Sequence, residues 1–155
     1  MGYRKVAVDD LPNAPSPARE KREVDEAVGS TEFGLNVYVA DPGEELPWGY
    51  HHHPDHEEVF LVVAGELVVE TPEGPYRVGE NEALYVPPDH RNRARATGDE
   101  PCRVVAVGAP KASDGAVIRE QCPDCGTETG REYEREGDEI VLNCTDCGRE
   151  TKRFS

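Results

Sequence analysis

Histidines and carboxylates gather in one stretch of the chain, and their spacing suits a bound metal ion. The sequence from Gly43 to Gly65, GEELPWGYHHHPDHEEVFLVVAG, holds four of the five histidines. On a β-strand alternate side chains share a face, so His51 and His53 are expected to point the same way. Glu58 on the next strand adds a carboxylate, and two imidazoles with one carboxylate form the ligand set of open divalent-metal sites. The alternative interpretation is a solvated, histidine-rich loop, since unpaired histidines are usually surface or core residues.

The carboxylate of this ligand set has two candidates, Glu57 and Glu58. Glu57 has the opposite strand parity and fits the spacing to the following glycine less well, so Glu58 is preferred. Phe60 and Val62 share the parity of Glu58. We therefore expect these two side chains to line the wall of a small-molecule pocket beside the metal.

Four cysteines near the C-terminus form a second ligand set. Two C-x2-C pairs, CPDC and CTDC, are separated by eighteen residues. This spacing is a strong signature of a structural Zn²⁺ site with four thiolate ligands, and the segment resembles a zinc ribbon. The expected zinc ligands are Cys122, Cys125, Cys144 and Cys147. The alternative is a pair of disulfides, which a reducing cytosol disfavours.

The elements that must position the histidines are predicted to be β-strands. Residues 33–40 alternate as a half-buried strand does, and residues 57–70 read as a hairpin around an Ala-Gly turn. Residues 91–109 read as two strands joined by a Thr-Gly-Asp-Glu-Pro turn. Turns recur at short intervals, and no helical period of useful length appears in residues 31–110. The predicted fold class is therefore all-β, a sandwich or barrel.

The spacing H-x-H-x4-E-x6-G, from His51 to Gly65, resembles the first motif of the cupin superfamily. The segments GELVVETPEG, PYRVGE and NEALYVPP that follow also look like a cupin, and the resemblance covers about residues 35–108. It implies the double-stranded β-helix, or jelly-roll barrel, of that family, with a divalent transition metal facing a small-molecule pocket. It does not identify an activity, because one fold hosts many functions.

The second half of the metal motif departs from the family pattern. In the stretch VPPDHRNRARATGDEP the family's second histidine position falls on Asn92, and His90 lies two residues earlier. Strand parity places both residues on the inward face, because the opposite choice would bury Arg91, Arg93 and Arg95. Three interpretations follow. His90 reaches the metal after a local shift of the turn, Asn92 contacts the metal or its bound water, or the site keeps only three ligands.

Four segments are predicted along the chain. They are an N-terminal arm (1–30), the cupin barrel (31–110), a polar linker (111–121) and the zinc ribbon (122–155). In small cupins such arms often complete the sheets of a dimer, so the resemblance implies a homodimer. A ribbon of this size cannot bury a core by itself, so its metal is expected to hold its fold. We expect the ribbon to be structural or to contact a protein partner.

Acidic residues dominate the charge of the chain. Asp and Glu number 32 against 17 Lys and Arg, which gives a formal net charge of −15. The acids are dispersed and lysine is scarce, so the chain resembles a salt-adapted, halophilic archaeal protein, with an ordinary acidic protein as the alternative. Residues 41–90 carry twelve acids and a single base, Arg77, which disfavours nucleic acid as a partner.

The expected location is the cytoplasm, without membrane contact. No apolar run approaches the length of a membrane span. The initial sequence MGYRKVAVDDLPN has no secretory h-region. A cytoplasmic location also keeps thiols reduced, as the predicted zinc site requires.

These observations predict a metal-binding cupin that holds a small molecule in its barrel and carries a structural or partner-contacting zinc ribbon. The first alternative is an enzyme of the dioxygenase or isomerase class that uses the barrel metal, whose identity the sequence leaves open. The only further general bases in view lie at residues 55–57 on a strand edge, which favours binding over catalysis. The second alternative, a nucleic-acid or transcription-associated ribbon protein, is disfavoured by the acidic charge.

Overall fold

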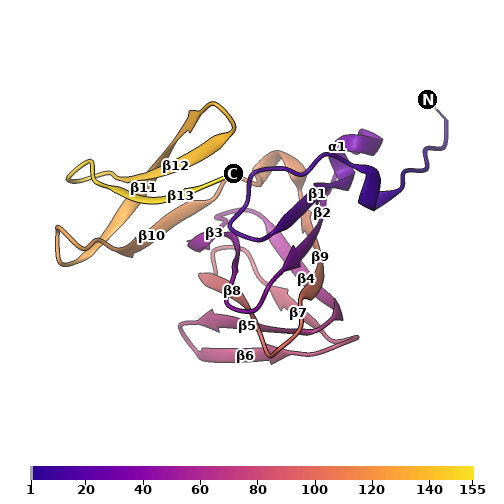
Figure 1. Cartoon of the computed structure of the whole chain (residues 1–155), viewed down its shortest axis with the longest axis horizontal. Coiled ribbons are helices and arrows are strands. Elements are labelled where there is room, and N and C mark those ends of the chain that lie inside the picture. Colours follow the sequence, from indigo (N-terminus) through magenta and orange to yellow (C-terminus); the bar gives the residue numbers. More distant parts are fainter. Residues whose placement is uncertain (1) are drawn as a thin grey trace.

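Strands make up most of residues 2–155, which are the residues that the computed structural model of the chain describes (Figure 1). The strands are β1 (Glu20–Glu23), β2 (Gly34–Ala40), β3 (Glu45–His52), β4 (Glu57–Ala64), β5 (Glu66–Thr71), β6 (Gly74–Val78), β7 (Ala83–Val86), β8 (Asn92–Thr97), β9 (Cys102–Ala109), β10 (Val117–Gln121), β11 (Glu128–Glu136), β12 (Glu139–Cys144) and β13 (Glu150–Phe154). The helices are η1 (Val8–Asp10), α1 (Val24–Val28) and η2 (Lys111–Ser113). Within the described residues, no helix has the length and apolar character needed to cross a membrane.

Two sheets form the barrel and enclose its core. One sheet has the strand order β1-β2-β9-β4-β7, and the other runs β13-β12-β11-β10-β3-β8-β5-β6. Side chains from both sheets meet in one buried cluster, which includes Phe60 and Val62 of β4, Leu67 of β5 and Ala94 of β8. The all-β prediction and the double-stranded β-helix are confirmed.

Strand β4 shows how alternation defines the two faces of a sheet. Phe60 and Val62 point inward and are buried. Val59, Leu61 and Val63 occupy the alternate positions and are 36%, 39% and 45% exposed. β4 is therefore apolar on both faces, and its outer face leaves aliphatic side chains in water. These three side chains form an exposed apolar row on the outer face of β4.

The eight-stranded sheet continues from the barrel into the C-terminal segment 122–155, called the ribbon below. β10 pairs with β3 on one side, where Ile118 lies opposite His51, and with β11 on the other. The predicted polar linker 111–121 therefore contains a sheet strand. It forms because Ile118 is buried with Ile140 and Leu142 of β12. The boundaries of the four predicted segments themselves stay a prediction.

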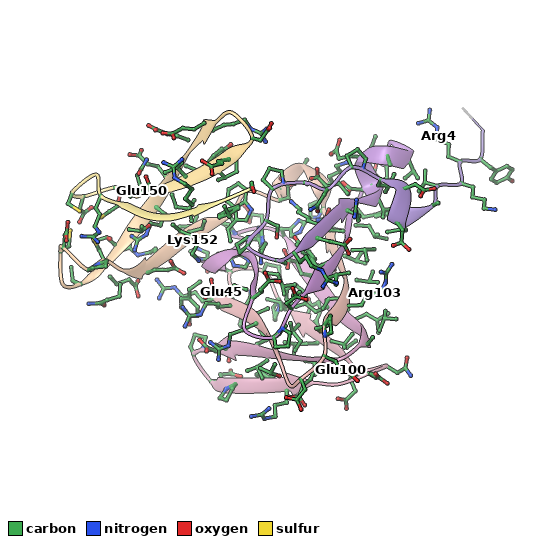
Figure 2. The ribbon with its side chains drawn as sticks, viewed as in Figure 1. Arg4, Glu45, Glu100, Arg103, Glu150 and Lys152 are labelled. Atoms are coloured by element: carbon green, nitrogen blue, oxygen red, sulfur yellow. The ribbon has the colours of Figure 1, made fainter. Side chains whose placement is uncertain are left out.

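Side chains also hold the ribbon against the barrel. Lys152 on β13 reaches β3, where its Nζ lies 2.7 Å from Glu45 Oε2 and donates to the Trp48 carbonyl oxygen at 3.0 Å (Figure 2). These contacts join residues more than a hundred positions apart in the chain. The ribbon is thus docked on the barrel by an ion pair as well as by strand pairing.

The N-terminal arm completes a sheet of its own barrel. β1 pairs antiparallel with β2 of the same chain, with Lys21 opposite Tyr38. α1 follows and ends at Gly29, whose φ of 74° lies in the left-handed region that favours glycine. Asp25 of α1 is buried and pairs with Lys111 at 2.8 Å. The family resemblance implied instead that the arm would complete a sheet of a dimer partner.

Candidate metal centre and ligand pocket

The end of β3, the turn after it and the start of β4 bring three histidines and a glutamate together. His51 lies on β3, His53 and His56 lie in the turn, and Glu58 lies on β4. β3 and β4 belong to opposite sheets, so this turn crosses from one sheet to the other. Ligand atoms of His51, His53 and Glu58 all lie within 4.8 Å of one another. The predicted set of two imidazoles and one carboxylate is thus assembled around a common point, as a shared divalent ion requires.

Hydrogen bonds to the backbone orient two of the histidine rings. His51 Nδ1 lies 2.8 Å from the Gly49 carbonyl oxygen, and His56 Nδ1 lies 2.9 Å from the Pro110 carbonyl oxygen. A carbonyl oxygen only accepts, so Nδ1 of each ring carries the proton and Nε2 carries the lone pair that binds a metal. His51 Nε2 is buried and has no hydrogen-bond partner in the described part of the chain. Such an atom fits a position where a ligand is held.

Glu58 governs the protonation of the cluster. Its Oε1 lies 2.7 Å from His53 Nε2 and 3.7 Å from His56 Nε2. Burial opposes charge on both partners, yet the Glu58 carboxylate raises the pKa of His53, and His53 in turn lowers the pKa of Glu58. Burial also lowers the pKa of His51. His51 is therefore neutral, with a lone pair on Nε2, and a cation held by this cluster would take the place of the proton on His53.

His56 lies beside the histidine cluster although it is not among the predicted metal ligands. The sequence places it only among possible general bases at a strand edge. It is 4% exposed, and its ring centroid lies 4.9 Å from that of His53. Gly108 on β9 leaves room for the ring, because a Cβ at that position would lie 2.0 Å from His56 Nε2. His56 shares strand parity with Glu58, and this parity is the signal in the sequence that identifies it.

The two residues of the second motif lie differently from each other. His90 is exposed, and its Nδ1 lies 2.8 Å from the Pro88 carbonyl oxygen in the turn before β8. It lies outside the three-residue cluster because Asp89, with a φ of 60°, turns the chain, and β8 begins only at Asn92. Asn92 is 1% exposed and lies opposite His51 in the strand register. Neither amide atom of Asn92 has a hydrogen-bond partner within residues 2–155.

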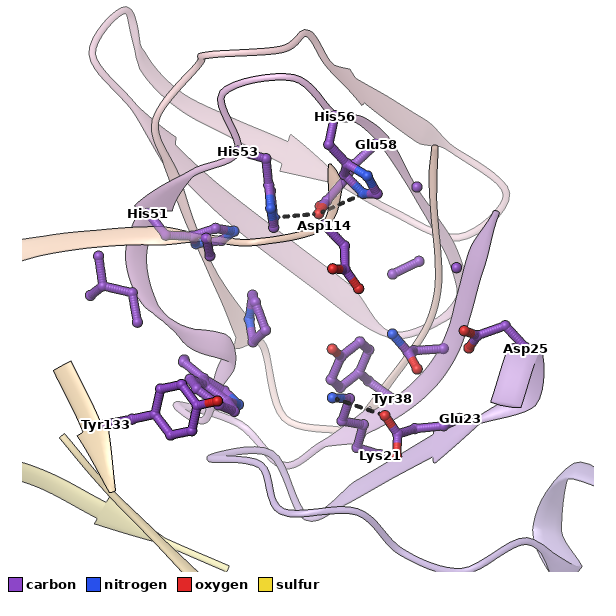
Figure 3. A pocket seen from close by; sticks show the side chains of 18 of the residues that line it. Lys21, Glu23, Asp25, Tyr38, His51, His53, His56, Glu58, Asp114 and Tyr133 are labelled. Atoms are coloured by element: carbon purple, nitrogen blue, oxygen red, sulfur yellow. Dashed lines mark ion pairs between the residues drawn. The ribbon is translucent and has the colours of Figure 1, made fainter. Parts of the chain in front are cut away.

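A cavity of about 450 Å³ opens beside the histidine cluster (Figure 3). Phe60 lines it as predicted, whereas Val62 lies one pleat further along β4 and belongs to the buried core. Tyr38 also lines it and is 3% exposed, and its hydroxyl has no hydrogen bond to any described residue. Burial is the main cause that raises the pKa of Tyr38 well above its ordinary value. Tyr38 is therefore a protonated donor facing the cavity.

Acidic side chains dominate the lining of the cavity. They are Glu23, Asp25, Glu26, Glu58, Asp114 and Glu132. Among the described lining residues the basic ones are Lys21 and Arg131, and Lys21 Nζ lies 3.6 Å from Glu23. Arg131 donates to backbone carbonyl oxygens, among them that of Thr129 at 3.1 Å. Both cations are thus engaged, and several of the acids are paired as well, Glu23 with Lys21 and Asp25 with Lys111.

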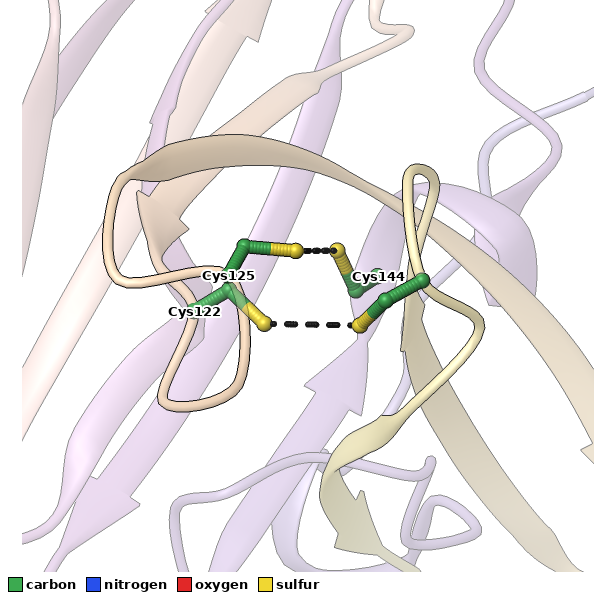
Figure 4. A group of neighbouring side chains, drawn as sticks. Cys122, Cys125 and Cys144 are labelled. Atoms are coloured by element: carbon green, nitrogen blue, oxygen red, sulfur yellow. Dashed lines mark hydrogen bonds between the residues drawn. The ribbon is translucent and has the colours of Figure 1, made fainter.

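The four cysteines form a separate cluster in the ribbon (Figure 4). Cys122 Sγ lies 3.7 Å from Cys147 Sγ, and Cys125 Sγ lies 3.9 Å from Cys144 Sγ. Four sulfurs held tetrahedrally at about 2.3 Å from Zn²⁺ are about 3.8 Å apart, so these distances fit zinc. They are far longer than the roughly 2.05 Å of a disulfide bond, and all four cysteines are free.

The two cysteine turns repeat one backbone pattern. Gly126 N donates to the Cys122 carbonyl oxygen and Gly148 N to that of Cys144, each at 2.9 Å. The φ angles of the two glycines, 70° and 79°, are ones that other residues rarely adopt. Thr129 Oγ1 lies 3.0 Å from Cys144 Sγ, and this hydrogen bond is the main cause that lowers the pKa of Cys144 to about 6. Cys144 is therefore a thiolate at neutral pH, which is the form that binds metal.

Known proteins resemble the barrel in sequence. Residues 36–108 match the cupin domain family (Cupin_2). Protein SchB of Streptomyces halstedii is 34% identical over 111 residues, which cover 70% of this chain and 79% of that protein. Polyketide synthase CurC of Streptomyces cyaneus is 35% identical over 96 residues, which cover 60% of this chain and 61% of that protein.

Solved structures resemble the chain in fold. The polyketide cyclase RemF of Streptomyces resistomycificus has a TM-score of 0.62 at 19% identity, covering 74% of this chain and 84% of that one. A sugar phosphate isomerase from a cupin superfamily, from Silicibacter pomeroyi, has a TM-score of 0.60 at 21% identity, covering 96% of this chain and 92% of that one. At these identities the likeness shows the common fold, which hosts many functions.

Proposed function

Because the chain belongs to the cupin domain family, we propose that it is a metal-binding cupin that holds a small molecule in its barrel cavity. The observation that carries this proposal is the meeting of His51, His53 and Glu58, whose ligand atoms lie within 4.8 Å of one another beside the cavity. The buried, unpartnered Nε2 of His51 supports it, since burying a polar atom without a partner is costly. Imidazole and carboxylate ligands together suit a divalent transition metal.

The residues around the cavity have distinct parts in this proposal. His51, His53 and Glu58 hold the ion, which supplies Lewis acidity to an oxygen atom of the bound molecule. The Tyr38 hydroxyl donates a hydrogen bond to a second polar atom of that molecule. Trp48 covers its apolar part and excludes water from that side of the cavity.

The names of the similar proteins suggest two classes of ligand, which differ in their charge. CurC is named a polyketide synthase and RemF a polyketide cyclase, and polyketides are oxygen-rich carbon skeletons. The Silicibacter pomeroyi protein is named a sugar phosphate isomerase, and a sugar phosphate is an anion. Lys21 and Arg131 are both engaged elsewhere and so are not free to bind a phosphate group, which leads us to favour an uncharged, oxygen-rich ligand.

A second candidate function is a metal-dependent enzyme of the isomerase or dioxygenase class. Two groups besides the proposed ligands favour it, because the His56 ring and the Tyr38 hydroxyl line the same cavity. A base and an acid facing one bound molecule meet the minimum requirement for moving a proton between its atoms. We expect the wild-type chain to catalyse deuterium exchange beside the carbonyl group of a bound hydroxy ketone, followed by NMR. Equal exchange in His56→Ala would contradict a role for His56.

We also propose that the four cysteines hold a structural Zn²⁺ ion. The sulfur separations of 3.7 and 3.9 Å support this proposal, as does the hydrogen bond from Thr129 to Cys144. The acidic charge of the ribbon opposes binding to nucleic acid. A protein partner at the ribbon, a cytoplasmic location and salt adaptation stay predictions.

A homodimer through the outer face of β4 is a further part of the proposal. Val59, Leu61 and Val63 are exposed there, and Tyr85 of β7, opposite Val59, is 53% exposed. A second copy suits this face, because a two-fold axis makes one patch its own partner and the exposed side chains of the patch are uncharged. We expect Leu61→Asp to convert a dimer to a monomer in light scattering, and Tyr76→Asp on β6 to leave the mass unchanged. A wild-type monomer would contradict the dimer.

Elemental analysis of untagged protein, purified at high salt without chelator, tests the main proposal. We expect one zinc and one further transition metal per chain. Substituting His51→Ala should remove the second metal and leave the zinc, whereas His90→Ala should remove neither. A wild-type chain that holds zinc alone, and takes up no second metal on titration, would overturn the barrel site.

A further inference from the structure

The ribbon supplies part of the wall of the barrel cavity. Arg131, Glu132 and Tyr133 of β11 and Leu142 of β12 line the same cavity as the histidine cluster. Figure 3 shows Tyr133 entering from the ribbon strands, apart from the histidines on the barrel. The segment that carries the cysteines therefore also borders the space in which a ligand would lie.

Trp48 on β3 is the point where this wall meets the barrel. Its ring centroid lies 5.3 Å from that of Tyr133, at an interplanar angle of 71°, and 5.6 Å from that of Phe154 on β13. The edge-to-face arrangement with Tyr133 is a favourable aromatic geometry. Ile140 and Leu142 of β12 belong to the buried cluster against which Trp48 and Phe154 pack. The wall is thus a packed interface between ribbon and barrel.

A short series of hydrogen bonds connects the cysteine cluster to this wall. Thr129 Oγ1 lies 3.0 Å from Cys144 Sγ and accepts a hydrogen bond of 2.8 Å from Arg131 Nη1. Arg131 Nη2 donates to the Glu120 carbonyl oxygen at 3.1 Å, and the Glu120 carboxylate accepts from Tyr50 N at 2.8 Å. The series leads from a zinc ligand, through a residue that lines the cavity, to β3 of the barrel.

We propose that zinc in the cysteine cluster holds this wall against the barrel, and that Tyr133 and Trp48 on it select a planar, uncharged ligand for the barrel site. The ligand part rests on the proposed function, whereas the docking part rests on the contacts between ribbon and barrel. A ribbon of this size needs its metal to stay folded, so loss of zinc removes Tyr133 from the cavity. Aromatic rings pack well on a planar ligand, and the two basic lining residues, Lys21 and Arg131, are engaged elsewhere and so are not free to bind an anion.

Tryptophan fluorescence tests the docking part without any ligand. Trp48 is the single tryptophan of the chain, so its emission reports on the interface with Tyr133 and Phe154. In the double variant Cys122→Ser/Cys147→Ser we expect zinc to be lost, the emission to move to longer wavelength and acrylamide quenching to increase. The matched control is Cys102→Ala, the cysteine outside the cluster, which should change none of these. Unchanged Trp48 emission after complete loss of zinc would overturn the coupling.

Ligand titration tests the selective part on the fully metallated protein. The probe is a hydroxyacetonaphthone, a planar and uncharged hydroxy ketone, with glucose phosphate as the anionic comparison. We expect Tyr133→Ala to weaken binding of the planar probe about tenfold, while both metals stay bound. Tyr76→Ala, on exposed β6, should bind like the wild type.

The outcomes of this titration separate the two proposals. Equal binding by wild type and Tyr133→Ala would overturn the selective wall and leave the proposed function standing. Tighter binding of glucose phosphate than of the hydroxyacetonaphthone would overturn the ligand class. A metallated wild-type chain that binds neither probe would count against the proposed function, and the Trp48 measurement would still decide whether zinc holds the wall.

Discussion

The cysteine cluster and the histidine cluster differ in how far along the chain their supporting residues lie. Each cysteine pair occupies one tight turn, and the hydrogen bond to Cys144 comes from Thr129 within the same ribbon. The histidine cluster depends on distant residues, because the Pro110 carbonyl oxygen orients His56 and Gly108 leaves room for its ring. The comparison teaches that the ribbon site is encoded locally, whereas the barrel site is a product of how two sheets pack.

The largest expected effect comes from removing a ligand of the locally encoded site. We expect Cys144→Ser to abolish zinc binding and to unfold the ribbon, because a segment of this size is held by its metal. Hydrogen exchange should rise across residues 122–155 and stay low in β4 and β9 of the barrel. Retained zinc would contradict Cys144 as a ligand, and loss of protection throughout the barrel would show that the barrel depends on the ribbon.

The second prediction concerns the distant support of the barrel site. In Gly108→Ala the new methyl group would overlap His56 Nε2, at 2.0 Å, so the ring must move. We expect a loss of about 1–3 kcal/mol in the free energy of unfolding and weaker binding of the barrel metal, with zinc unchanged. The control is Gly115→Ala, where a Cβ meets nothing within 4 Å. Thermal melts and metal titrations of Gly108→Ala that match the wild type would contradict a role for Gly108 in supporting the barrel site.

A third variant sharpens the comparison within the ribbon. Thr129→Val keeps the shape of the buried side chain but removes the hydroxyl that lies 3.0 Å from Cys144 Sγ. Outer hydrogen bonds of this type tune metal affinity, so we expect zinc to bind about 10–100-fold more weakly in competition with a chromophoric chelator. Thr127→Val, at an exposed position, should bind zinc as the wild type does. No difference between the two variants would contradict the role of the hydroxyl.

The smallest expected effect is on the cavity itself. Tyr38→Phe removes a hydroxyl that has no hydrogen bond to the described residues, so the free energy of unfolding should change by no more than about 0.5 kcal/mol. Binding of a hydroxyacetonaphthone should weaken about two- to tenfold, as expected for one lost hydrogen bond. Both metals should remain. The matched change Tyr76→Phe, on exposed β6, should leave the affinity for the hydroxyacetonaphthone, measured by calorimetry, unchanged. Equal affinity of both variants would show that the Tyr38 hydroxyl does not contact the ligand.

The same contrast explains what the sequence predicted. Strand parity placed Asn92 on the inner face of β8, where it is buried together with Ala94 and Ala96. It also placed the arginines of β8 outside, where Arg93 meets Glu70 at 2.6 Å. The cysteine spacing depends on neighbouring residues alone, and the structure brings the four cysteines together. Signals of short range in the chain were sufficient for these features.

Features that depend on distant parts of the chain escaped the sequence. Ile118 stands in a polar segment and becomes a core residue only because β3 and the ribbon lie on either side of it. His56 packs beside His53 because β9 carries a glycine, Gly108, where the His56 ring lies. The prediction placed His90 inward because it assumed that the strand already includes His90. The chain instead turns at Asp89, and β8 begins only at Asn92. The alternation of polar and apolar residues within one segment does not predict these contacts with distant segments.

The pairing of β10 with β3 has a consequence for the behaviour of the chain in a crowded cell. In the order of the eight-stranded sheet, β3 would be the border strand of the barrel if β10 to β13 were absent. A border strand presents unpaired backbone donors and acceptors, which recruit strands of other molecules and seed aggregates. β10 pairs with the end of β3, at His51 and His52, within the same chain. We therefore expect the C-terminal segment to reduce aggregation through this edge. A chain cut after residue 110 is expected to precipitate.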